Sequence, residues 1–140
     1  MNLTEVNLIT NSEKAKSNAI IAREITGLIE GQRIIHTSSM FPIARVHMDR
    51  LVDTIKANPV LASMLKQVRH GHGTQSVEFI NGGQIRYIAR SYGGGRGLSA
   101  DLVIIDNSNE SCPESFMQGI YPTLCTSADP EVWFARVERG

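Results

Sequence analysis

The chain has 140 residues, of which 41% are hydrophobic, and this fits one soluble globular domain. Its 14 basic and 14 acidic residues cancel, which argues against a free-standing DNA-binding protein but leaves room for a local basic patch. Cys112 and Cys125 lack metal-ligand spacing and are too few for a disulfide framework, so we expect reduced cysteines in a cytosolic protein. The sequence shows neither the pattern of a signal peptide nor an apolar run of membrane-spanning length.

The first 37 residues predict a strand, a helix and a second strand. Residues 6–9 are typical of a short strand, and Ser12 is placed to cap a helix that runs to Glu30. Apolar residues recur along this stretch at helical spacing, and Gly31 follows in the usual position beyond a helix end. Residues 33–37 form the second strand. A βαβ unit with short connections indicates a parallel sheet.

The middle of the chain predicts two further helices and a hairpin. Pro42 suits the first turn of a helix that ends at Asn58-Pro59, and residues 60–68 have the apolar spacing of another short helix. Alternating apolar residues at 76–80 and 84–88 flank an Asn-Gly-Gly turn, the clearest hairpin signal in the sequence.

The last third predicts a buried strand behind a glycine-rich loop. Residues 90–99 form the loop, and four consecutive apolar residues at 102–105 lead into Asp106. Residues 113–119 favour a helix and residues 132–134 a last strand. The expected fold is a three-layer α/β domain over residues 1–140 with a mostly parallel sheet, a phosphate-loop core and a β-hairpin insertion.

Residues 10–17, TNSEKAKS, stand where a phosphate-binding loop would join a strand to a helix. Such a loop reads G-x-x-x-x-G-K-[ST], and here Lys16 and Ser17 match its last two positions. Thr10 and Ala15 replace both glycines, and a methyl group at position 15 would crowd the approach of a phosphate. A capped amphipathic helix with solvated lysines explains the same residues without any nucleotide.

Asp106 lies where α/β sheets bind ligands, at the carboxyl end of a buried strand. It could hold Mg²⁺ through water, as in phosphate-loop enzymes, or simply end the strand in solvent. Asn107 cannot act as a general base, although its amide could orient a water molecule.

The arginines and histidines allow further predictions. Arg96, in the glycine-rich loop, could stabilise phosphoryl transfer in a neighbouring subunit, or could bond backbone carbonyls; Arg90 carries the same two interpretations. We expect the four histidines not to form a metal site, since no cysteine or carboxylate cluster stands with them in the sequence.

The order of these segments resembles the ATPase domain of the large terminase subunit of tailed phages, the motor that packages DNA. RIIHTSS resembles the second strand of that domain, and PTLCTSADPEVWFARV the stretch leading into its coupling motif. The longest and most specific match is SVEFINGGQIRYIARSYGGGRGLSADLVIID, which resembles the hairpin, the glycine-arginine loop and the Walker B strand.

The resemblance implies roles for five residues. Lys16 and Ser17 match the Walker A lysine and hydroxyl, and Asp106 matches the Walker B aspartate, so Ser17 and Asp106 would hold the metal. Asn107 stands in the position of the catalytic glutamate, and Arg96 is the candidate arginine finger.

The departures from the family pattern point to impaired or lost hydrolysis. Ala15, which would line the nucleotide beside the lysine, replaces a glycine, and an amide replaces the Walker B glutamate. Residues 135–137 lack the small hydroxyl side chains of the coupling motif, and the family's nuclease domain is not part of the sequence.

The resemblance also implies ligands and partners. Mg²⁺ and ATP are expected if the site is functional, and no cofactor otherwise. Partners would be other terminase subunits, the portal or further copies of the chain, with DNA contacted only in an assembly and no membrane. The expected location is the cytoplasm of a phage-infected or prophage-carrying bacterial host.

Three interpretations are open on the sequence. The chain is a packaging ATPase domain that still binds nucleotide, or a pseudo-ATPase that acts as a binding, regulatory or structural phage protein. An unrelated function on the same scaffold is the third, because fold does not fix function.

Overall fold

The computed structural model describes residues 2–71, 75–90, 97–110 and 112–139. Its strands are β1 (Thr4–Thr10), β2 (Arg33–Ser38), β3 (Leu65–Arg69), β4 (Ser76–Phe79), β5 (Gln84–Ala89), β6 (Leu102–Asp106) and β7 (Glu131–Val137). Its helices are α1 (Glu13–Ile29), α2 (Phe41–Lys56), α3 (Pro59–Met64), α4 (Glu114–Ile120) and a 3-10 helix (Tyr121–Leu124).

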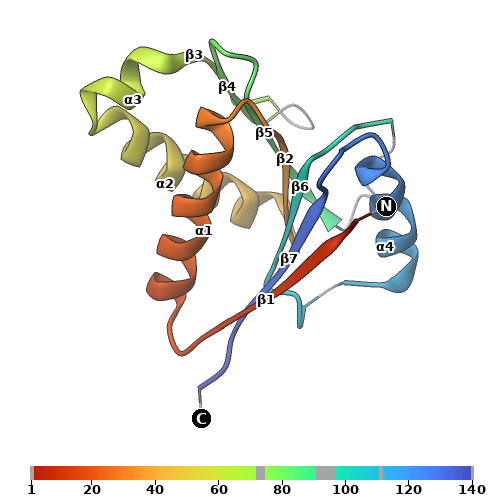
Figure 1. The fold of residues 1–140 in the computed structure, drawn as a ribbon. Coiled ribbons are helices and arrows are strands. Elements are labelled where there is room, and N and C mark those ends of the chain that lie inside the picture. The colour runs from red at the N-terminus through yellow and green to blue at the C-terminus, as the bar shows by residue number, and fades with distance from the viewer. Residues whose placement is uncertain (1, 72–74, 91–96, 111, 140) are drawn as a thin grey trace.

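The described strands form one seven-stranded sheet in the order β1-β7-β6-β2-β5-β4-β3. The five strands from β1 to β5 in this order run parallel, and β4 and β3 continue the sheet antiparallel. Helices α1, α2 and α3 cover one face, and α4 with the 3-10 helix covers the other (Figure 1). This confirms the predicted three-layer α/β fold with a mostly parallel sheet.

Two apolar cores separate the three layers, because successive side chains of a strand point to opposite faces. Ile34 of β2 packs with Leu28, Met48 and Leu51 under α1 and α2, whereas its neighbour Ile35 packs on the α4 side. Every residue of β6 is buried, since this strand lies inside the sheet with both faces covered.

The predicted hairpin is confirmed, and its turn contacts the end of α1. The side-chain amide of Asn81 donates to the carbonyls of Leu28 and Ile29, at 3.0 and 2.9 Å. These carbonyls lie in the last turn of the helix, where the i+4 donors are missing, and that of Leu28 also accepts from the N–H of Gly31 at 3.1 Å. Because β5 also pairs in parallel with β2, the hairpin extends the main sheet and locks it to α1.

The prediction of a helix over residues 60–68 is wrong in its second half. Helix α3 ends at Met64, and Leu65 already has extended backbone angles of −74° and 122°. Strand β3 follows and pairs antiparallel with β4. The backbone hydrogen bonds offered by the sheet edge therefore override the helical spacing of the apolar residues.

No helix among the described residues is long and apolar enough to cross a membrane.

Candidate functional site

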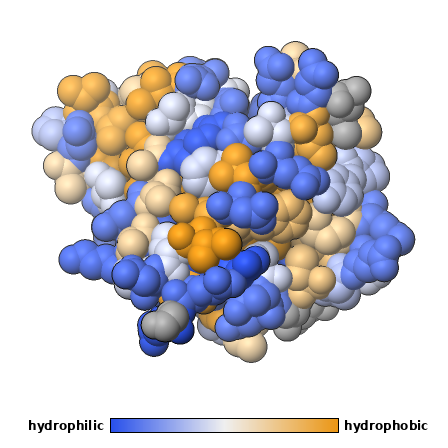
Figure 2. All heavy atoms as spheres, turned by 60° about the horizontal axis from the view of Figure 1, so that its bottom comes forward, coloured by the Kyte–Doolittle hydropathy of each residue, from blue (hydrophilic) through white to orange (hydrophobic). Residues whose placement is uncertain are grey.

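The predicted site residues that the structure describes lie at the carboxyl ends of the parallel strands, where α1 begins. Figure 2 shows this face of the molecule, with hydrophilic side chains surrounding a smaller hydrophobic area. Ligand sites of open α/β sheets lie at this edge.

Only two residues, Asn11 and Ser12, connect β1 to α1. Ser12 has extended backbone angles and caps the helix, because its Oγ accepts from the N–H of Ala15 at 3.1 Å. Its carbonyl accepts from the N–H of Lys16 at 3.1 Å. In a phosphate-binding loop the N–H groups at these positions would point toward the ligand. Here the N–H groups of residues 15 and 16 instead donate to Ser12.

The side chain of Lys16 is buried, and its ammonium contacts three oxygen atoms. Its Nζ lies 2.5 Å from Oδ1 of Asp106 and donates to Oδ1 of Asn107, also at 2.5 Å. Glu13, one turn earlier on α1, places Oε2 at 3.1 Å. A lysine ammonium has three donors, so these three acceptors match its full capacity.

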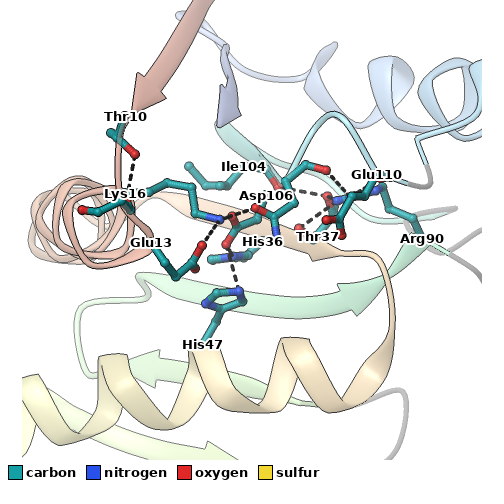
Figure 3. A network of polar contacts seen from close by, with 12 residues as sticks. Thr10, Glu13, Lys16, His36, Thr37, His47, Arg90, Ile104, Asp106 and Glu110 are labelled. Carbon is teal, nitrogen blue, oxygen red and sulfur yellow. Dashed lines mark hydrogen bonds and ion pairs between the residues drawn. The ribbon is translucent and has the colours of Figure 1, made fainter. Parts of the chain in front are cut away.

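Asp106 is the centre of a buried polar network (Figure 3). Its Oδ2 lies 2.9 Å from Nε2 of His36 and 3.1 Å from Nε2 of His47. On the far side of its ring, His36 contacts Oε2 of Glu24 through Nδ1 at 2.8 Å. Strands β2 and β6 and helices α1 and α2 therefore all contribute to one charged cluster.

The charges of the network favour ionised forms of Asp106 and His36. Burial alone would lower the pKa of His36, but Glu24 and Asp106 raise it to about 9. Burial would likewise raise the pKa of Asp106, but the hydrogen bond and charge of His36 hold it well below its usual range. Burial, together with the charge of His36, lowers the pKa of His47 to about 4, so this ring is neutral at pH 7.

Asn107 has a backbone φ of 51°, in the left-handed region that asparagine enters more easily than most residues. Arg90 holds this turn in place. Its guanidinium donates to the carbonyls of Asn107 and Glu110, at 3.0 and 2.7 Å, and to the carbonyl and hydroxyl of Thr37. The sequence left two roles open for Arg90, and the structure shows the one in which the arginine donates to backbone carbonyls.

The structure brings together three of the sequence-predicted residues, Lys16, Asp106 and Asn107. Ser17 is buried beside them and lines a narrow cavity with His36 and His47, whereas Ala15 is exposed on the first turn of α1. Arg96 lies outside the described residues.

Sequence reasoning missed His36, His47 and Glu24. We expected the four histidines to form no metal set, yet the fold brings two of them to a carboxylate: ligand atoms of His36, His47 and Asp106 lie within 4.8 Å of one another. One signal was present: His36 follows two apolar residues, Ile34 and Ile35, within a predicted strand.

The described residues do not fit Mg²⁺ and ATP in this arrangement. The connection before α1 forms no phosphate cradle, and the lysine that would meet the phosphates is 0% exposed and held by Asp106. Both oxygens of Asp106 already contact cationic or ring nitrogen atoms. A nucleotide would have to displace these contacts before it could bind.

Neither a protein-family model nor a curated protein sequence matches the chain. Solved structures do match. The HK97 bacteriophage large terminase aligns with 95% of this chain and 29% of its own length, at 17% identity and a TM-score of 0.77.

The ATPase domain of the Thermus phage P74-26 large terminase aligns with 95% of this chain and 60% of its own length, at 17% identity and a TM-score of 0.68. A mutant of that domain aligns at 14% identity and a TM-score of 0.70. The chain therefore has the fold of these ATPase domains and spans less than two thirds of each matched chain.

Proposed function

We propose that the chain is a terminase-like phage protein related to the DNA-packaging ATPase, with hydrolysis of ATP impaired or lost. The fold shared with phage large terminases supports the first part. The observation that carries the second part is the buried ion pair between Lys16 and Asp106.

This ion pair opposes nucleotide binding by a large factor. Removing one partner from a buried ion pair typically costs about 3–5 kcal/mol. A nucleotide that drew Lys16 away from Asp106 would have to offset a cost of this order. Such a cost weakens binding by about 10²–10⁴-fold, which would move a dissociation constant of about 1 μM to about 0.1–10 mM.

Catalysis would be slow even in a protein that bound ATP. Asn107 has no ionisable group, so it cannot take a proton from an attacking water molecule. General base catalysis is worth about 10²–10⁴ in rate. The losses at Lys16 and Asn107 act on different steps and multiply.

In this proposal Lys16, Ser17 and Asp106 stabilise the fold where related enzymes would bind a metal nucleotide. The chain then acts through its surface, on other terminase subunits, the portal or further copies of itself. DNA is contacted only within such an assembly, in keeping with a formal net charge of zero.

Calorimetry with Mg-ATP tests the nucleotide part of the proposal. Wild-type protein, Lys16→Ala and the exposed control Lys14→Ala are titrated, and phosphate release is followed on the same samples. We expect no saturable heat and no turnover in any of them. Saturable binding and turnover that Lys16→Ala abolishes and Lys14→Ala preserves would favour the working ATPase domain instead.

Deletion of the coding sequence from its phage or prophage tests the packaging part. We expect fewer DNA-filled capsids, and complementation with the chain should restore them. An unchanged yield of packaged DNA would contradict a role in packaging.

A further inference from the structure

Three potential metal ligands converge in the interior of the protein. Nitrogen atoms of His36 and His47 and a carboxylate oxygen of Asp106 lie within 4.8 Å of one another, and all three residues are buried. They come from β2, α2 and β6, so the sheet and a covering helix jointly fix their positions (Figure 3).

The hydrogen-bonding capacity of this cluster is not filled. Nε2 of His47 contacts Oδ2 of Asp106 at 3.1 Å but makes no hydrogen bond within the described part of the chain. The hydroxyl of Tyr87, whose ring centroid lies 5.1 Å from that of His36, is also buried without such a bond. Buried polar atoms are nearly always paired, so these two atoms leave capacity for a further partner.

Glu24 orients His36 in the way that metal sites require. Its carboxylate contacts Nδ1 of the ring at 2.8 Å, which leaves Nε2 directed at Asp106. Metal-bound histidines usually donate their second ring N–H to a carboxylate or carbonyl in this manner.

We propose that His36, His47 and Asp106 bind a divalent transition metal ion such as Zn²⁺ or Co²⁺. Metal bonds of about 2.1 Å in a tetrahedral site place ligand atoms about 3.4 Å apart. The contacts of 2.9 and 3.1 Å to Asp106 therefore need only a small expansion. The ion takes the place of the proton between His36 and Asp106.

The ligand set distinguishes this ion from the Mg²⁺ of nucleotide enzymes. Two imidazoles and one carboxylate suit Zn²⁺, Co²⁺ or Fe²⁺, whereas Mg²⁺ prefers oxygen ligands in an octahedron. Glu24 contacts His36 and Glu13 contacts Lys16, so together with Asp106 the cluster holds three carboxylates and one ammonium and can offset the added positive charge. The proposed ion therefore needs no nucleotide in order to bind.

Titration with Co²⁺ tests the proposal, because its visible absorption reports ligand type and geometry. Wild-type protein should give a saturable tetrahedral spectrum that Zn²⁺ abolishes and Mg²⁺ leaves unchanged, with a rise in melting temperature. His47→Leu preserves bulk but removes one ligand. Loss of a residue that only hydrogen-bonds a metal ligand typically weakens metal binding by about 10–100-fold. His47→Leu removes a ligand itself, so it should weaken Co²⁺ binding by at least this factor. The exposed His70→Ala should bind like the wild type.

NMR on the wild-type chain decides the question even if His47→Leu fails to fold. The ring signals of His36 and His47 should broaden with substoichiometric Co²⁺, while that of His70 stays sharp. The proposal would be overturned if the absorption did not saturate up to about 1 mM Co²⁺, because the dissociation constant would then be weaker than about 1 mM. Equal affinity of the wild type and His47→Leu, displacement by Mg²⁺, or broadening confined to other histidines would overturn it as well.

Discussion

Replacing Lys16 by methionine should destabilise the protein strongly, although a surface lysine would tolerate the same change. Methionine keeps most of the volume and removes the ammonium. Asp106 then loses one of its cationic partners, and the Oδ1 of Asn107 loses its donor. Loss of one partner of a buried ion pair costs about 3–5 kcal/mol, and because His36 still faces Asp106 we expect about 3 kcal/mol.

Urea unfolding followed by circular dichroism and by Trp133 fluorescence measures this change. A loss of about 3 kcal/mol corresponds to a fall in melting temperature of about 10 °C for a domain of this size. Lys14→Met is the matched control, because Lys14 is exposed on the same helix and should change stability by less than about 0.5 kcal/mol. Equal stabilities of the two variants would refute the buried ion pair.

Three further changes test other parts of the structure. Asp101 accepts hydrogen bonds from the backbone and guanidinium of Arg33, which lower its pKa although burial opposes this. Its contribution is full above pH 4 and declines in acid, so Asp101→Asn should lose about 1 kcal/mol at pH 7 and less at pH 2 in urea unfolding. Gly83→Ala would place a methyl group 2.4 Å from the carbonyl oxygen of Leu28, and should lower stability by about 1–3 kcal/mol in the same assay. Asn107→Glu should not produce phosphate release from ATP, because the position is left-handed and the side chain faces a lysine already paired.

Each of these changes has a control or a contrary outcome. Gly119→Ala adds a methyl group into open space on α4, and should raise stability slightly where Gly83→Ala lowers it. A parallel loss of stability in Asp101→Asn at pH 2 and pH 7 would contradict the charge-based explanation. Turnover gained in Asn107→Glu and lost again with Lys16→Ala would show that the site binds ATP after all.

The layers and most elements were predictable because their signals are local. The apolar run before Asp106, the capping residue Ser12 and the Asn-Gly-Gly turn each specify their own segment whatever surrounds it. The strand Leu65–Arg69 was not predicted, because it forms by pairing with β4, and the local spacing of apolar residues does not reveal that neighbour.

The cluster around Asp106 depends on contacts between distant parts of the chain. His36 faces Asp106 because β2 and β6 are neighbours, with His36 in register with Ile104. His47 joins them only because α2 packs over the same face. Before the strand order is known, neither histidine can be paired with the aspartate. The state of Lys16 was unpredictable for the same reason, because its burial follows from this packing.

Amine-reactive labelling of the native protein, read out by mass spectrometry, tests most directly whether the site is closed. The chain has four lysines, and Lys14, Lys56 and Lys66 are exposed whereas Lys16 is buried. A closed site predicts rapid labelling of the three exposed lysines and strong protection of Lys16, unchanged by millimolar Mg-ATP. Labelling of Lys16 at the rate of the others, slowed when Mg-ATP is added, would contradict it and show an open nucleotide site.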